Sequence, residues 1–139
     1  MHCFLLQDWL LVRMPTSTTT ITQSEHAWLD LADYRDVVFW YEVKEVSNGG
    51  GTLTIALQTG PSKDEEFFTA LVSPTVVVGA GAIVVHHDWA TVPLARWLRW
   101  QLIVSGTVTT TPEITFRIWV AVATGRQKAG GAARPWRRV

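Results

Sequence analysis

Apolar and polar residues alternate with a period of two along most of the chain, which is the pattern of β-strands with one buried face. The clearest run covers residues 113–123, and the same alternation predicts strands at 34–46, 52–59, 67–72, 75–78, 83–87 and 94–105. In the run 113–123 the side chains expected to face inward are Ile114, Phe116, Ile118, Val120 and Val122. Strands of this number and spacing predict an all-β fold, a single antiparallel β-sandwich of jelly-roll or Greek-key type.

Turn signals separate these runs. Asn48-Gly49-Gly50-Gly51 stands between the runs 34–46 and 52–59, so a β-hairpin is expected there. Apart from residues 3–12, no stretch of ten residues shows a helical period, and no repeat of fixed length is present.

The two ends of the chain differ from its middle. We expect residues 1–24 to form an N-terminal arm, with a short amphipathic helix over 3–12 and then a Ser/Thr-rich extended linker or edge strand. Residues 25–124 are the predicted β-sandwich domain, and residues 125–139 a basic flexible tail. A second methionine, Met14, leaves open a translation start there, in which case residues 1–13 would not belong to the natural protein.

Composition adds a charge asymmetry to this picture. Of the 139 residues, 47% are hydrophobic and 17% charged, the profile of a packed sheet protein or of one part of an assembly. The net charge of zero divides into a basic tail and a preceding body with seven basic and twelve acidic residues, a net charge of −5. The tail predicts contacts with the acidic surface of a neighbouring subunit or with nucleic acid. Its candidate contact residues are Arg126, Lys128, Arg134, Trp136, Arg137 and Arg138.

Eight tryptophans are present, and their positions in the alternation differ. Trp100 falls on the predicted core face, whereas Trp40, Trp97 and Trp119 fall on the opposite face together with Arg99 and Arg117. Large rings on a solvated face indicate that something covers them. Three interpretations stay open: a loop or the arm of the same chain covers this face, it is a subunit interface, or its indoles stack on sugar rings.

Histidine, acidic and glycine-rich segments form metal, catalytic or phosphate sites in other proteins, but in this sequence their patterns favour structural roles. His86-His87-Asp88 resembles part of a metal site, but neighbouring residues on a strand point to opposite faces and too few ligands remain. The acidic run 64–66 is expected to be a solvated loop, and neither glycine-rich segment has the sequence of a phosphate loop. We therefore predict no catalytic residue, no metal and no cofactor, and a protein that is not an enzyme.

The lengths of the hydrophobic runs predict a protein that does not cross a membrane. No run approaches the ~18 apolar residues of a membrane span. The opening residues lack a basic lead, so no secretion signal is expected, and the one cysteine, Cys3, cannot form an intrachain disulfide.

Three segments between Trp28 and Ala123 carry a resemblance to a known class of proteins. They are Leu29-Asp30-Leu31-Ala32-Asp33-Tyr34-Arg35-Asp36-Val37-Val38-Phe39, Leu53-Thr54-Ile55-Ala56-Leu57-Gln58-Thr59 and Leu98-Arg99-Trp100-Gln101-Leu102. Together they resemble the small jelly-roll-like β-sandwich proteins of phage and phage-like particles, although these motifs also suit other jelly rolls.

The resemblance implies a non-enzymatic structural subunit of a virion, such as a decoration, minor capsid or tail-associated protein. Its partners would be its own copies and other virion proteins, with nucleic acid reached only through the basic tail. It would assemble in the host cytoplasm. The alternative is a carbohydrate-binding β-sandwich module that uses the exposed tryptophans.

Overall fold

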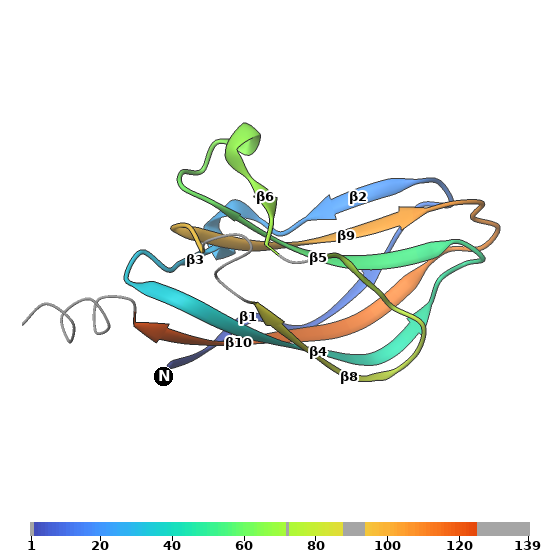
Figure 1. The fold of residues 1–139 in the computed structure, drawn as a ribbon. Helices are drawn as coiled ribbons and strands as arrows, with labels where there is room; N and C mark the ends of the chain where they lie inside the picture. Colours follow the sequence, from blue (N-terminus) through green and yellow to red (C-terminus); the bar gives the residue numbers. More distant parts are fainter. Residues whose placement is uncertain (1, 72, 88–93, 125–139) are drawn as a thin grey trace, which may run out of the picture.

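Two antiparallel sheets pack face to face in the computed structural model, which describes residues 2–71, 73–87 and 94–124 (Figure 1). Sheet A consists, in order, of β1 (His2–Arg13), β10 (Glu113–Thr124), β4 (Tyr34–Ser47) and β8 (Gly81–His87). Sheet B consists of β2 (Thr19–Thr22), β9 (Trp97–Ser105), β5 (Thr52–Gly60) and β6 (Thr69–Ala70), with β3 (Leu29–Asp30) beside β9 and β7 (Thr75–Val76) beside β5. Two short 3-10 helices, η1 (Glu25–Ala27) and η2 (Glu65–Phe67), lie in the connections. The predicted all-β sandwich is confirmed.

The order of strand pairing is that of a jelly roll. The first strand pairs with the last, β1 with β10, and successive strands pair inward from there: β2 with β9, β4 with β8, and β5 with β6 and β7. The first half of the chain thus pairs with the second half, and successive pairs alternate between sheet A and sheet B. This arrangement places β1 and β2 at corresponding edges of the two sheets.

The alternation in the sequence predicts the core well. All five inward positions of β10 are buried, as are the inward side chains of β9 and β4. Trp100 is 3% exposed and packs edge-on against Phe116 with ring centroids 5.1 Å apart, as its place on the core face predicts. Burial of these side chains between the sheets supplies the main stabilisation of the fold.

The hairpin predicted at Asn48-Gly49-Gly50-Gly51 is wrong. β4 belongs to sheet A and β5 to sheet B, so this turn carries the chain from one sheet to the other. Gly49 has φ +67°, and a Cβ there would lie 2.2 Å from the carbonyl oxygen of Thr110, whose amide donates to the Gly49 carbonyl oxygen. The same turn residues suit a hairpin within one sheet and a crossing between two sheets, because they indicate only that the chain reverses.

The helix expected over residues 3–12 is also wrong, because these residues form β1. Two register shifts, between Leu5 and Gln7 and between Gln7 and Leu10, interrupt its pairing with β10 and with it the alternation on which strand prediction depends. Within the predicted arm, residues 2–13 and 19–22 therefore supply edge strands of both sheets.

Some of the predictions fall outside the described part of the chain. These concern the basic tail at 125–139, with its six candidate contact residues, and residues 88 and 89. Within the ranges that the structure describes, no helix is long and apolar enough to cross a membrane.

Candidate functional site

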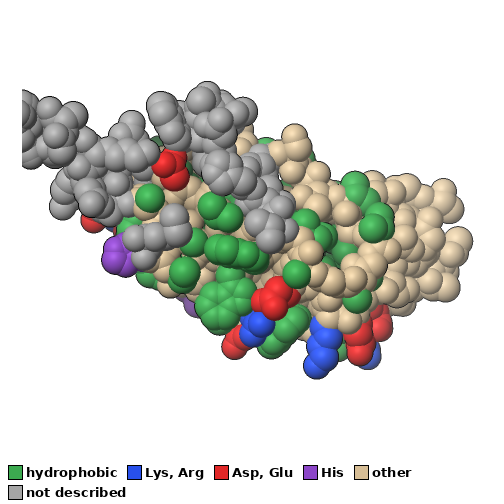
Figure 2. All heavy atoms as spheres, turned by 60° about the horizontal axis from the view of Figure 1, so that its bottom comes forward, with side chains coloured by type: hydrophobic (Ala, Val, Ile, Leu, Met, Phe, Trp, Pro, Cys, Tyr) green, Lys and Arg blue, Asp and Glu red, His purple; other side chains and the backbone are tan. Residues whose placement is uncertain are grey.

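Two of the three outward tryptophans lie side by side on the outer face of sheet A. Trp119 of β10 is directly opposite Trp40 of β4, and on its other side it is opposite Leu5 of β1. We call the outward side chains Leu5, Trp9, Trp40 and Trp119 the aromatic face. Figure 2 shows hydrophobic side chains gathered on this side of the molecule beside acidic and basic groups. Leu5 and Trp9 are 37% and 42% exposed, whereas Trp40 and Trp119 are partly buried. The expected apolar surface is thus present across three adjacent strands, with its two indoles partly covered by their neighbours.

An ion pair lies against two of the three rings of the aromatic face. Arg117 is opposite Glu42 in the ladder and donates two hydrogen bonds to its carboxylate, 2.8 and 3.0 Å long. The Arg117 guanidinium carbon lies 4.5 Å from the ring centre of Trp9 and 5.3 Å from that of Trp119. The hydrogen bonds from Arg117 lower the pKa of Glu42 below its ordinary value, so the pair stays ionised.

A hollow of about 420 Å³ lies against the two indoles. Its lining residues are Cys3, Trp40, Glu42, Ala82 and Trp119. The volume is in the range of small-molecule sites, but the only charged lining group, the Glu42 carboxylate, is already engaged by Arg117. Among these described lining residues, no pair of free polar groups converges for catalysis.

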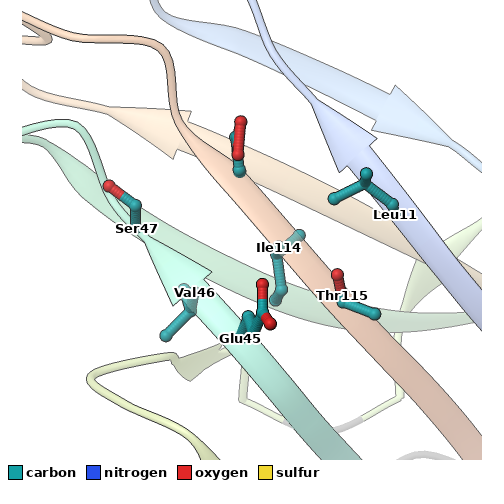
Figure 3. Close-up of a pocket in the computed structure, with 7 residues that line it drawn as sticks. Leu11, Glu45, Val46, Ser47, Ile114 and Thr115 are labelled. Carbon is teal, nitrogen blue, oxygen red and sulfur yellow. The ribbon is translucent and has the colours of Figure 1, made fainter.

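The opposite end of this sheet face is charged. A smaller hollow of about 120 Å³ forms there, where the pairing of β10 with β4 shifts between Thr115 and Phe116. Its lining side chains come from β1, β10 and β4 (Figure 3). Glu113, one of its lining residues, pairs with Arg13 at 3.1 Å. The outer face of sheet A therefore divides into an apolar part around the indole pair and a charged part.

Trp97 and Arg99 are not on this face, so the prediction that all five candidate interface residues share one face is wrong. Both residues belong to β9, in sheet B. Alternation distinguishes inward from outward positions on a strand, but it does not say to which of the two sheets the strand belongs. The ring of Trp97 contacts the Lys63 ammonium, 4.4 Å from the ring centre, and the Arg96 guanidinium at 5.1 Å.

Arg99 is buried under the connection that contains η2, with 0% of its side chain exposed. Its guanidinium donates to both carboxylate oxygens of Glu65, at 2.9 and 2.5 Å, and its Nε donates to Gln58 at 2.8 Å. The rings of Phe68 and Trp28 lie 3.9 and 5.0 Å from the guanidinium carbon. Arg99 therefore fastens the η2 connection to sheet B and presents no surface to a partner.

The role of Glu65 is one that sequence reasoning missed. It was expected to be part of a solvated acidic loop, and its side chain is indeed 75% exposed, but its carboxylate is the partner of the buried Arg99. Hydrogen bonding from Arg99 lowers the pKa of Glu65. Its position, 34 residues from Arg99 in the chain, gives no local signal of the pair.

Comparisons with known proteins bear on the fold alone. No protein-family model matches the chain, and no curated protein matches it. Among solved structures, the fold is similar to that of a chain in the structure of infectious bursal disease virus, Gx strain, with a TM-score of 0.54 and 10% sequence identity. The similarity covers 89% of this chain and 33% of the viral chain, so the present chain spans about a third of its length.

Proposed function

We propose that this protein is a non-enzymatic structural subunit of a virus particle or a virus-like assembly, and that it acts through protein–protein contacts of its aromatic face. The observation that carries the proposal is the row of Leu5, Trp119 and Trp40 across the outer face of sheet A. None of the described elements outside sheet A pairs with it or lies in the hollow beside these rings. Large contiguous apolar surfaces of this kind mark interaction sites.

The composition of the face favours protein as the partner. Tryptophan and arginine are the residues most enriched among the energetically dominant contacts of protein interfaces. Here Arg117, bound to Glu42, packs against Trp9 and Trp119, so these rings are ordered before a partner arrives. Less conformational entropy is then lost on binding.

The fold supports the same proposal. Double-sheet jelly rolls are a common architecture of viral capsid proteins, and the similar chain comes from a virus structure. The finer role that fits best is a decoration, minor capsid or tail-associated protein, located in the virion and bound to its own copies and to other virion proteins.

The test is the size of the protein in solution, measured by size-exclusion chromatography with light scattering over a concentration series. We expect species well above the 15.5 kDa of one chain, and a smaller species for the double variant Trp40→Ser with Trp119→Ser. Trp97→Ser, an outward change on sheet B, is the matched control and should leave the size unchanged. A monomer at every concentration would count against the proposal, as would a double variant that no longer unfolds cooperatively.

A second function has one observation in its favour. The hollow of about 420 Å³ presents two indoles, whose flat apolar faces suit stacking on a sugar ring, beside the Glu42 carboxylate that Arg117 engages. A glycan array, followed by calorimetry at millimolar sugar, decides between the two: binding that disappears in Trp40→Ser supports a carbohydrate-binding module, and no binder at all rejects it.

A further inference from the structure

Strand β1 lies at the edge of sheet A but has the sequence of an interior strand. The sheet order ends at β1, and no described residue other than those of β10 pairs with it. Edge strands in soluble proteins are usually short or carry lysine or proline, which block pairing with other chains. The other edge on this side of the sandwich, β2, follows that rule with four residues, Thr-Thr-Ile-Thr. In β1, by contrast, twelve residues contain no lysine or proline, and Asp8 and the two register shifts interrupt only its centre.

Both faces of β1 are apolar, and both are incompletely buried. On the outer face Leu5, Trp9 and Leu11 are 37%, 42% and 53% exposed. On the inner face Phe4, Leu10 and Val12 are only partly buried against the core. A strand that is apolar on both faces is typical of the middle of a sheet, where neighbours on each side cover it.

The hydrogen bonds of β1 are satisfied in its centre and open at its two flanks. In the centre the side chain of Gln23 donates to the Leu6 carbonyl oxygen at 2.8 Å, and the Trp9 amide donates to the Asp8 carboxylate, also at 2.8 Å. Within the described part of the chain, no backbone group of the flanks 2–5 and 10–13 bonds to anything besides β10. These two flanks offer the backbone groups that an added strand needs.

We propose that β1 pairs in antiparallel fashion with β1 of a second copy of this chain, about a two-fold axis at Gln7. The inference deepens the proposed function, on which it rests, by naming one partner of the subunit. Read outward from Gln7, the two flanks are self-complementary: Leu5 meets Trp9, Phe4 meets Leu10 and Cys3 meets Leu11. Next to the axis the buried Leu6 would meet the exposed Asp8, so the match is confined to the flanks.

Each of these pairs also joins side chains on the same face of the sheet. Leu5 and Cys3 are opposite the outward Trp119 and Ala121, and Leu11 is opposite the outward Thr115. Phe4 and Leu10 are opposite the inward Val120 and Phe116. Antiparallel partners must match in this way for a sheet to keep one apolar side.

A groove between β1 and β2 gives the second copy a place to pack. The groove has a volume of about 360 Å³. Half of its lining residues are apolar, namely Leu10, Val12, Ile21, Ala27 and Trp100, and the other half are polar, namely Gln7, Thr22, Gln23, Ser24 and His26. Because Phe4 of the second copy would lie opposite Leu10 on the inner face, it would cover this groove. The added strand thus buries apolar surface on its inner face as well as pairing its backbone.

The resulting dimer has one eight-stranded sheet made from two copies of sheet A. Its outer side joins the two aromatic faces, and the two-fold axis closes the contact after two chains. The aromatic face remains open to further partners, so strand pairing and face contacts are separable.

Cysteine cross-linking tests the pairing directly, because Cys3 is exposed and free. In the dimer, Leu11→Cys places its thiol opposite Cys3 of the second copy, with Cβ atoms about 5 Å apart. Mild oxidation should then convert most of the protein to a covalent dimer of about twice 15.5 kDa. The double variant Cys3→Ser with Leu11→Cys should give almost none, because its two thiols are eight residues apart along the strands.

Thr115→Cys is the matched control for the strand edge. Thr115 is opposite Leu11 on the same face, one strand further from the edge. Its distance from Cys3 of the second copy is two strand spacings, about 9.6 Å, which is too far for a disulfide. Equal cross-linking of Leu11→Cys and Thr115→Cys would overturn the pairing, and so would cross-linking of the Cys3→Ser, Leu11→Cys variant.

The outcomes separate this inference from the proposed function. If Leu11→Cys fails to cross-link while light scattering still shows association that the Trp40, Trp119 double variant reduces, strand pairing is wrong and the aromatic face stands. If the chain is monomeric in every measurement, both proposals fail.

Discussion

The buried guanidinium of Arg99 makes an unusual prediction: removing its exposed partner should destabilise the fold more than removing Arg99 itself. Glu65→Ala leaves a fully buried charge with only the Gln58 oxygen as an acceptor. Arg99→Met leaves the Glu65 carboxylate, whose side chain is 75% exposed and can be solvated. The methionine also keeps an apolar stem against Phe68 and Trp28.

The magnitudes follow from these differences in exposure. Removal of one partner of a buried ion pair lowers the free energy of unfolding by about 3–5 kcal/mol. Because water has partial access to the η2 connection, we expect the lower end of this range, about 3 kcal/mol, for Glu65→Ala. Arg99→Met loses the cation–π contacts and the hydrogen bonds to a solvated group, about 1 kcal/mol. At about 4 °C per kcal/mol for a chain of this size, Tm should fall by about 12 °C and about 4 °C.

Urea and thermal unfolding followed by tryptophan fluorescence measure both values. Glu66→Ala, a change in the neighbouring carboxylate, is the control and should alter the free energy of unfolding by less than about 0.5 kcal/mol. If Arg99→Met proves as destabilising as Glu65→Ala, then Arg99 is not isolated from water in the way the structure indicates, and the reasoning fails.

Three further changes have expected outcomes. Arg99 holds the pKa of Glu65 below its ordinary value of 4.5. The pair should therefore stabilise the fold above about pH 4.5 and lose this effect as the pH falls below it. Between pH 6 and pH 3, the urea midpoint of Glu65→Gln should fall less steeply than that of the wild type. Asp8 lies next to the proposed two-fold axis, so Asp8→Asn should tighten self-association about two- to five-fold by sedimentation velocity, and a weaker dimer would contradict the placement of the axis. Gly49→Ala should cost about 2 kcal/mol or more in urea unfolding, because its Cβ meets the Thr110 carbonyl oxygen. Gly106→Ala has a similar φ of +84°, but its Cβ would make only an ordinary contact, 3.9 Å from the Gly51 Cα, so it should cost less. Equal losses would show that backbone strain alone decides both.

The sequence predicts strands and their buried sides better than it predicts which strands are neighbours. Inward positions such as Phe116 and Trp100 follow from a period of two, which is a local property. The separation of Trp97 from Trp119 depends on strand order, which is set by contacts between distant segments. The turn at Gly49 illustrates the same limit, since its residues suit a hairpin and a crossing between sheets equally.

The edge strand and the buried arginine show two other limits. Adjacent leucines at 5–6 and 10–11 hide the alternation of β1, because the bulges between them shift the side-chain pattern. The burial of Arg99 depends on a connection that folds back over sheet B, and a single strand does not reveal what covers its outer face.

The most direct test of the central claim is how accessible the indoles of the aromatic face are as the protein concentration rises. Hydroxyl-radical footprinting with mass spectrometry reports oxidation of each tryptophan separately. If the aromatic face is a protein-contact surface, oxidation of Trp40 and Trp119 should fall several-fold from dilute to concentrated protein, while that of Trp97 on sheet B stays constant. Oxidation of Trp40 and Trp119 that does not change over this range, with the fold intact, would contradict the proposed function.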